Sequence, residues 1–223
     1  HGKFRRQRQM CIRDSCKTMQ TNLYKNDLPD NLQFEDILAI DTEAMGLDPA
    51  RDRLCLLQIY DGKGDCHLVQ FDGFDYHCPN LSKVLKDETK IKIFHYARFD
   101  MAAIKYALGI NLQNIYCTKI ASKIARTYTN SHGLKDICKE LLNVEISKKK
   151  QSSDWGNISL SQEQVDYAAN DVIYLHNIRF KLNEILLREK RLELAESCFK
   201  FLPTRVDLDL KGWVDKDIFS HSS

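Results

Sequence analysis

The order of the apolar runs constrains the fold most. Five short runs of strand-like composition precede Thr118, and helical spacing of apolar residues dominates after it. A turn signal at 61–65 separates the second run from the third, so the first three runs predict an antiparallel meander. Strands followed by helices on this scale are typical of one α/β domain rather than two. The predicted strands are Phe34–Ile40, Leu54–Tyr60, Cys66–Phe71, Lys92–His95 and Asn114–Cys117.

Capping residues mark several helix ends. Gly109 is a typical C-cap and ends a helix after Leu108. Ser161 and Gln164 match a capping box, which predicts that a helix begins there. The predicted helices are Asn80–Lys86, Phe99–Leu108, 161 to about Arg179, and a further stretch to about Phe199 that Pro203 ends.

Composition excludes several classes of protein. The chain has 223 residues and a net charge of +2, so no overall basic field indicates a long nucleic-acid partner. No apolar run approaches the ~20 residues of a membrane span. The eight cysteines form no C-x-x-C pair, which favours reduced thiols in a cytoplasm over a disulfide framework or a zinc site.

The first 18 residues show neither helical nor strand periodicity. Their arginines, Arg5, Arg6 and Arg8 among them, would suit a basic arm for nucleic acid. We favour a non-native or disordered extension, because the first residue is His1 and the periodic pattern begins later. Residues 19–223 are then expected to form one domain.

Acidic residues in three separate contexts are the candidates for chemistry. Asp41 and Glu43 follow an apolar strand and project to the same side of it. Asp100 opens a helix, and Tyr167 and Asp171 share a helical face at i and i+4. Each motif alone is commonplace, as a solvated strand end, a helix first-turn acid or an amphipathic face. Together, carboxylates from separate elements repel one another unless a multivalent cation holds them.

Six ordered blocks carry a resemblance to a known family. The chain resembles the DEDD 3′–5′ exonucleases of the tyrosine-bearing subclass, in the ribonuclease D branch. The ending, Phe201–Arg205 and Asp217–Ser222, is similar to the short alphaproteobacterial form called nanoRNase C. The matching blocks are Ile40–Leu47, Ile93–Asp100, Cys117–Ser122, His132–Lys135, Gln151–Trp155 and Tyr167–Leu175.

The resemblance implies a fold, a substrate and an assembly. The fold would be an RNase H-like five-stranded mixed sheet, in which the meander leads into parallel strands, flanked by helices and followed by a helical half. The chain would lack the helical RNA-binding repeats of long ribonuclease D. It would degrade short single-stranded oligoribonucleotides, including dinucleotides, as a homo-octameric ring without membrane association.

The resemblance also implies a mechanism with two divalent ions, Mg²⁺ or Mn²⁺. Asp41 would bridge both ions, Glu43 and Asp171 would hold the ion that forms the attacking hydroxide, and Asp100 would help to hold the second. Tyr167 would orient the water rather than act as a base, because its ordinary pKa is near 10. The products would be 5′-mononucleotides.

Substrate contacts are expected around these acids. Leu47 would act either as an apolar wedge between bases or as a core residue. Arg98 would neutralise a phosphate or pair with a nearby acid, and most of the lysine run at 148–150 would form a solvated surface. The predicted substrate-binding residues are Thr42, Met45, Gly46, Leu47, His95, Arg98, Phe99, His132, Lys148, Gln151 and Ser152.

Three readings of the function remain open. The first is an exoribonuclease for short RNA, and the second keeps the chemistry but acts broadly on structured RNA or single-stranded DNA. The third is a catalytically silent nucleic-acid-binding or assembly domain, since a fold alone never fixes function. The segment Arg188–Phe201 would supply either an oligomer interface or packing within its own domain.

Overall fold

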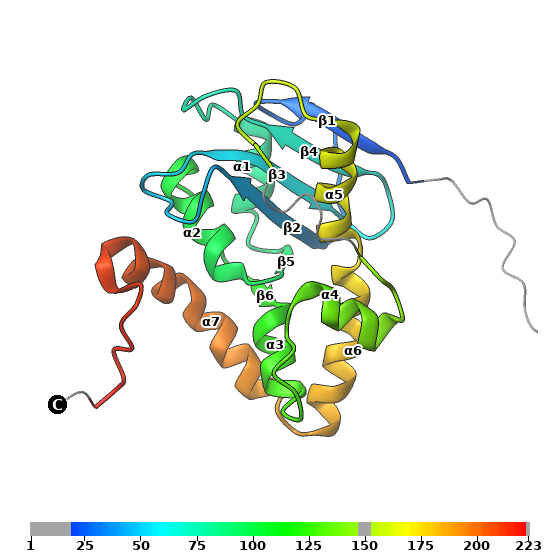
Figure 1. Ribbon diagram of the computed structural model, residues 1–223, viewed down its shortest axis with the longest axis vertical. Helices are drawn as coiled ribbons and strands as arrows, with labels where there is room; N and C mark the ends of the chain where they lie inside the picture. The colour runs from blue at the N-terminus through cyan, green and yellow to red at the C-terminus, as the bar shows by residue number, and fades with distance from the viewer. Residues whose placement is uncertain (1–18, 147–152, 222–223) are drawn as a thin grey trace, which may run out of the picture.

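The computed structural model describes residues 19–146 and 153–221. Its centre is a six-stranded mixed sheet in the order β1-β4-β3-β2-β5-β6 (Figure 1). The predicted meander is confirmed as β2, β3 and β4, which pair antiparallel, and β5 and β6 continue the sheet in parallel. The strands are β1 (Thr21–Lys25), β2 (Ile37–Ala44), β3 (Leu54–Tyr60), β4 (Cys66–Gln70), β5 (Ile91–Phe94) and β6 (Ile115–Cys117).

The sheet has one strand more than the five that the sequence predicts. β1 pairs parallel with β4 at one edge, with Thr21 opposite Cys66. Its five residues are too few and too polar to give a strand pattern. Contacts across the pair support it instead, such as the hydrogen bond between the Tyr24 hydroxyl and Nδ1 of His67. The partner strand, rather than local composition, makes this segment a strand.

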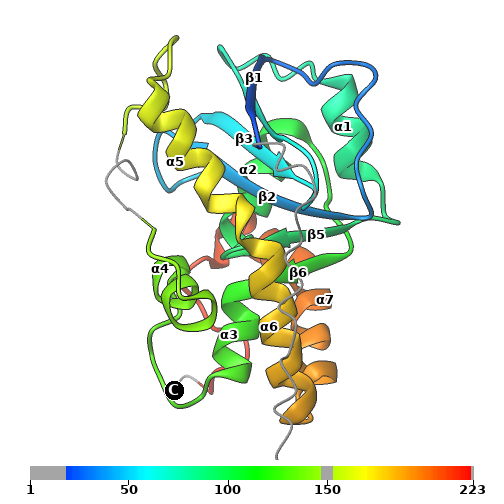
Figure 2. The same ribbon diagram turned by 90° about the vertical axis from the view of Figure 1, so that its right-hand side faces the viewer.

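Two helices approach the sheet from opposite faces (Figure 2). α5 (Gln162–Ile173) packs across β2, β3 and β4, whereas α2 (Ala97–Leu108) packs against β2 and β3 from the other side. Adjacent strand residues project to opposite faces, so Asp41 and Glu43 on β2 face α5 while Thr42 faces α2. The end of β2 therefore collects side chains from both layers.

Apart from α1, the remaining helices follow the last strand in the chain. Most of them gather beyond the β6 edge of the sheet (Figure 1). α4 continues into a π-helical turn, Cys138–Leu142, and α7 into another, Asp209–Trp213. The bounds are α1 (Pro79–Lys86), α3 (Thr118–Ala125), α4 (Leu134–Ile137), α6 (Leu175–Arg188) and α7 (Leu192–Leu208).

Two predicted helix boundaries are wrong. The helix that begins at the Ser161 capping box ends at Ile173 rather than near Arg179, because α5 packs across the sheet whereas α6 packs mainly against α3. Pro203 lies inside α7 instead of ending it. An interior proline costs about 3 kcal/mol or more. Burial of Leu202 and its neighbours on α7, at about 1.5–3 kcal/mol for each large apolar side chain, offsets that cost.

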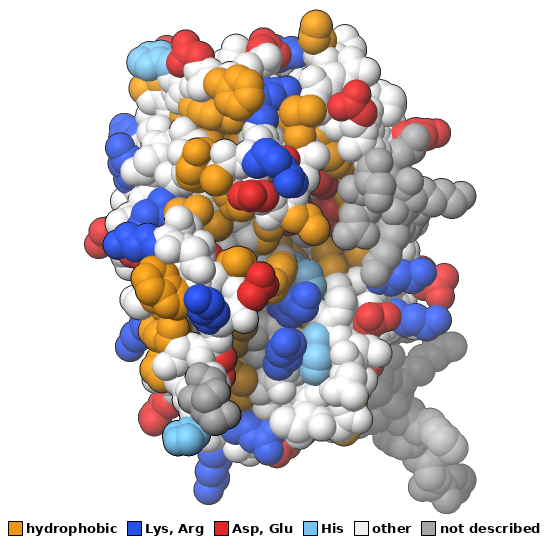
Figure 3. Space-filling view, turned by 60° about the vertical axis from the view of Figure 1, so that its left-hand side comes forward, with side chains coloured by type: hydrophobic (Ala, Val, Ile, Leu, Met, Phe, Trp, Pro, Cys, Tyr) orange, Lys and Arg blue, Asp and Glu red, His pale blue; other side chains and the backbone are white. Residues whose placement is uncertain are grey.

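The surface carries mixed charge. On the face shown in Figure 3, acidic, basic and hydrophobic side chains are interspersed, as the net charge of +2 leads one to expect. Within residues 19–146 and 153–221, none of the helices combines the length and apolar character that crossing a bilayer would require. The six cysteines in these ranges are all free, and five of them are buried.

Candidate active site

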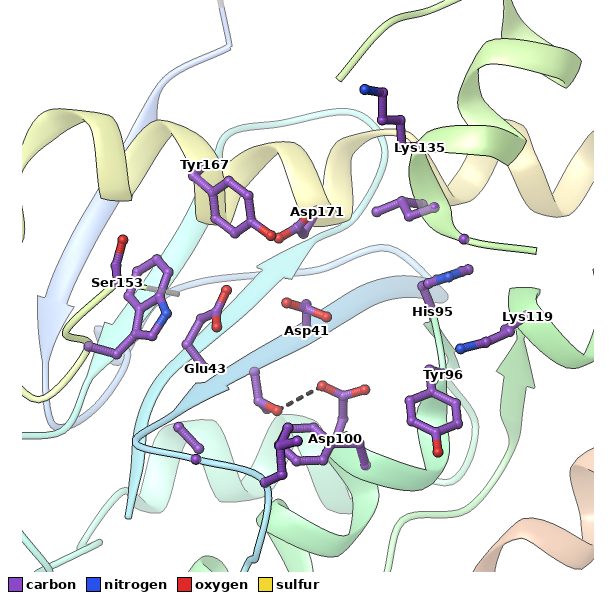
Figure 4. A pocket seen from close by; sticks show the side chains of 18 of the residues that line it. Asp41, Glu43, His95, Tyr96, Asp100, Lys119, Lys135, Ser153, Tyr167 and Asp171 are labelled. Carbon is purple, nitrogen blue, oxygen red and sulfur yellow. Dashed lines mark hydrogen bonds between the residues drawn. The ribbon is translucent and has the colours of Figure 1, made fainter. Parts of the chain in front are cut away.

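Four predicted acids converge at the end of β2 (Figure 4). Asp41 and Glu43 come from β2, and Asp171 comes from the facing side of α5. Each of these three offers a carboxylate oxygen, and the three oxygens lie within 4.8 Å of one another. Strand alternation places the first two, and the packing of α5 across β2 places the third.

Asp100 completes the group from the opposite layer. It lies in the first turn of α2 and is only 2 % exposed. The hydroxyl of Thr42 donates a hydrogen bond of 2.7 Å to Oδ1 of Asp100 (dashed in Figure 4). Thr42 is itself buried, so its predicted role in substrate binding becomes one of orienting Asp100. Asp100 also lies close enough to raise the pKa of Asp41 and of Glu43 through its charge.

Burial raises the pKa of all four carboxyl groups. The pKa of Asp41 lies well above its ordinary value, first through burial and then through the charges of Asp100, Asp171 and Glu43. Burial and the charges of Asp171 and Asp100 raise the pKa of Glu43 to about 9. Burial raises the pKa of Asp100 to about 7, against the hydrogen bond from Thr42. It raises the pKa of Asp171 to about 7 as well, against the hydrogen bond from Tyr167.

This cluster fits divalent cations. The carboxyl groups raise one another's pKa, and no basic side chain among the described residues lowers the pKa of Asp41 or of Glu43. Carboxylate oxygens are the ligands that Mg²⁺ and Mn²⁺ take in proteins. The donor set, four hard oxygen ligands from three elements, therefore suits such ions.

Tyr167 joins the cluster through Asp171. Its hydroxyl hydrogen-bonds the Asp171 carboxyl group, and its ring lies 6.1 Å from the ring of Trp155. Burial, followed by the charges of Asp171, Glu43 and Asp41, raises the pKa of Tyr167 above its ordinary value. The hydroxyl thus keeps its proton and can donate or orient, but it cannot serve as a base.

The acids line a cavity of about 630 Å³. Leu47 stands at its edge with 84 % of its surface exposed, which excludes the core role. Gly46 lines the cavity too, and a Cβ there would lie 2.2 Å from Oδ2 of Asp52, so a larger residue would have to displace that side chain. The predicted substrate-binding residues that line the cavity are Thr42, Met45, Gly46, Leu47, His95 and Phe99.

Two other predicted contacts lie away from the cavity. The guanidinium of Arg98 binds the carboxylate of Asp209 and the carbonyl of Val214, so it pairs with an acid, the alternative that the sequence left open. Nδ1 of His132 is hydrogen-bonded to the buried hydroxyl of Ser122 at 2.9 Å. Neither side chain is among those that line the cavity. The predicted residues Lys148, Gln151 and Ser152 lie outside the described residues.

The structure adds cations that the sequence did not single out. Lys119 and Lys135 line the cavity, and Nζ of Lys119 lies 4.2 Å from the centroid of the Tyr96 ring. Tyr96 has a left-handed backbone, with φ of 69°, which is uncommon for an aromatic residue. Lys119 lies on α3, separated from the acids in sequence, and only its position within the block Cys117–Ser122 could have indicated it.

Comparisons with known proteins agree with this site. A model of the 3′–5′ exonuclease family matches residues 16–187. Two structures of Brucella melitensis NrnC, one bound to pGG and one with bound Mg²⁺, are each 53 % identical to the chain, with TM-scores of 0.87 and 0.86. Each match covers 92 % of this chain and 100 % of the other.

A curated relative shares only part of its length with the chain. Ribonuclease D of Granulibacter bethesdensis is 32 % identical over 166 residues, which are 72 % of this chain and 40 % of that protein. The chain thus spans about two-fifths of the length of the curated relatives that it matches. From the family match, the full-length similarity to NrnC and the four converging acids, we conclude that the chain belongs to the ribonuclease D family of DEDD 3′–5′ exonucleases and is NrnC-like.

Proposed function

We propose that this protein hydrolyses short single-stranded oligoribonucleotides, including dinucleotides, from the 3′ end and releases 5′-mononucleotides. The observation that carries the proposal is the convergence of Asp41, Glu43, Asp100 and Asp171 beside Tyr167 in one cavity. The similarity to NrnC, which has been solved with pGG, supports a short substrate. We further propose that residues 19–223 act as one exonuclease domain, and the free buried cysteines suit a reducing cytoplasm.

The four acids would hold two divalent cations, Mg²⁺ or Mn²⁺. Bound cations of this kind lower the pKa of water and neutralise charge on the phosphate during hydrolysis. Asp41, at the centre of the group, would bridge the two sites, with Glu43 and Asp171 on one side and Asp100 on the other. Thr42 holds the Asp100 carboxylate in place. NrnC has been solved with bound Mg²⁺, which supports this assignment.

Tyr167 would orient the attacking water through its hydroxyl. We expect Tyr167→Phe to lower kcat by about 10²-fold, since positioned proton donors and acceptors contribute about 10²–10⁴-fold. KM should change little, because the ring and its contact with Trp155 remain. Steady-state kinetics on a dinucleotide measures both constants, and Tyr106→Phe, on an exposed tyrosine, is the control. An unchanged kcat would remove Tyr167 from the mechanism.

Leu47 would separate the two bases of the substrate at the cavity edge. We expect Leu47→Ala to raise KM for a dinucleotide about tenfold, since full burial of a leucine side chain is worth about 1.5–3 kcal/mol and the bases would cover part of it. Because Leu47 is exposed, thermal stability should not change. Leu187→Ala, at another exposed leucine on α6, is the matched control. If both variants keep the wild-type KM, Leu47 does not contact substrate.

Initial rates on three substrates test the proposed function. The purified protein with Mg²⁺ or Mn²⁺ is incubated with a 5′-labelled dinucleotide, a longer RNA and single-stranded DNA. Faster cleavage of the dinucleotide is expected, because a net charge of +2 gives no overall basic field to attract a long polymer. Equal or faster cleavage of long RNA or DNA would favour the broader exonuclease, and no cleavage of any substrate would favour the silent binding domain.

We also propose a homo-oligomer, in which α7 contributes to the interface. The apolar residues of α7 differ in their exposure. Ala195 and Phe199 are buried in their own domain, whereas Leu194 and Phe201 are partly exposed, at 58 % and 37 %. Light scattering at micromolar concentration measures the mass in solution, where a ring of eight subunits is expected. A monomer throughout would end this proposal.

A further inference from the structure

Gln58 lies beside the catalytic acids without belonging to them. It sits on β3 directly opposite Asp41 in the antiparallel pair of β2 and β3. Directly paired residues project from the same face of a sheet, with Cβ atoms about 4.5–5.5 Å apart. The Gln58 side chain therefore enters the layer between the sheet and α5, next to Asp41, and it is fully buried.

The amide of Gln58 has no hydrogen-bond partner. Among the described residues, neither Nε2 nor Oε1 finds a donor or acceptor. On the other side of Gln58 the paired residue on β4 is Leu68, and α5 buries Ala168 and Val172. A buried polar group without a partner costs free energy of folding, and such exceptions in proteins call for a functional or structural explanation.

Asp41, the residue on β2 that pairs with Gln58, has a carboxylate that can accept a hydrogen bond from this amide. A carboxylate that binds a cation still has lone pairs that accept hydrogen bonds, and such outer contacts fix its orientation. An amide nitrogen supplies two N–H donors. Gln58 is the residue paired with Asp41 on β3, and its two methylene groups are long enough for a side-chain rotation to bring the amide to the carboxylate.

We propose that Gln58 is a positioning residue for Asp41. When cations occupy the acid cluster, Nε2 of Gln58 donates a hydrogen bond to the Asp41 carboxylate and fixes the oxygens that face the ions. This inference rests on the proposed function, since it assumes that the acids bind divalent cations. Without bound cations the Gln58 amide stays unpaired and lowers the stability of the folded protein.

The test replaces the amide by a side chain of similar length that forms no such hydrogen bond. For Gln58→Met in the full chain, we expect Mn²⁺ affinity, measured by calorimetry, to fall about 10–100-fold, the usual loss when an outer-shell partner of a metal ligand is removed. The unfolding midpoint in EDTA should stay equal or rise, because the variant no longer buries an unpaired amide. A merely structural glutamine would give the opposite pattern.

Gln70→Met is the matched control. Gln70 is another buried glutamine, but its Nε2 donates a hydrogen bond of 2.7 Å to the carbonyl of Asn157. Its replacement should lower the midpoint in EDTA and leave Mn²⁺ affinity unchanged. In a third variant, Gln58→Met added to Asp41→Asn should weaken Mn²⁺ binding no further than Asp41→Asn alone, because Gln58 acts through Asp41.

Three outcomes overturn the proposal. The first is a Mn²⁺ affinity of Gln58→Met within a factor of two of the wild-type value. The second is a lower unfolding midpoint of Gln58→Met in EDTA, or its failure to fold. The third is a double variant whose loss of Mn²⁺ affinity equals the sum of the losses of the two single variants. Because affinity and stability are measured without turnover, the inference is separable from the proposed function. A wild-type protein that binds Mn²⁺ but cleaves no substrate contradicts the function alone, whereas one that binds no Mn²⁺ contradicts both.

Discussion

Asp41→Asn is expected to lower kcat/KM on a dinucleotide by at least about 10³-fold. Asp41 lies at the centre of the acid group, where the charges of Asp100, Asp171 and Glu43 all act on it. An asparagine keeps the shape but removes the negative charge that would bind both cations. Loss of several kcal/mol of transition-state stabilisation corresponds to this range, since about 1.4 kcal/mol is tenfold in rate.

The same substitution should stabilise the cation-free protein. Asp41→Asn removes one of four carboxyl groups that repel one another, so the unfolding midpoint in EDTA at pH 8 should rise. Kinetics with Mg²⁺ and thermal unfolding in EDTA measure the two effects on one preparation. Asp36→Asn, at a side chain that is 95 % exposed just before β2, should change neither. An active Asp41→Asn enzyme would end the proposed mechanism.

The stability of the cation-free protein is expected to fall steeply as the pH rises. An acid whose pKa is higher in the folded chain than in the unfolded chain holds its proton more tightly when folded. Raising the pH through the window between the two values therefore favours unfolding. For Asp100 and Asp171 this window runs from 3.8 to about 7, and for Glu43 from 4.5 to about 9.

The size of this effect follows from the pKa shifts. One pKa unit corresponds to about 1.4 kcal/mol, and about 1 kcal/mol moves the unfolding midpoint of a chain of this size by about 2–4 °C. Between pH 6 and pH 9 in EDTA we therefore expect the midpoint to fall by on the order of 10 °C. Calorimetric or fluorescence-monitored melting across this range measures the change.

Divalent cations should reverse the trend. Cation binding requires ionised carboxylates, so it releases protons and strengthens as the pH rises from about 6 to about 9. With saturating Mg²⁺ the midpoint should rise by more at pH 8 than at pH 6. The variant Asp41→Asn serves as the control and should show a smaller shift. A midpoint in EDTA that does not depend on pH would contradict the burial and repulsion described for the four acids.

The sequence predicted the candidate active-site residues more completely than it predicted the strands and the helix boundaries. Short motifs follow from local rules. Examples are the capping box at Ser161 and the acids Asp41 and Glu43 after an apolar strand. The edge strand β1 was missing because its pairing with β4 joins segments that are distant in sequence. Pro203 and the break at Tyr174 depended on how α6 and α7 pack, which local propensity does not determine.

The sequence by itself determined which groups are the candidates for the active site: four acids and a tyrosine in a fixed order. The tertiary structure alone decided that these side chains line one cavity, that Thr42 holds Asp100, that Arg98 pairs with Asp209, and that Lys119 lines the same cavity. The physical reason is the sequence distance over which each interaction acts. Alternation along a strand and spacing along a helix act over a few residues, whereas burial and electrostatic repulsion depend on which elements pack together.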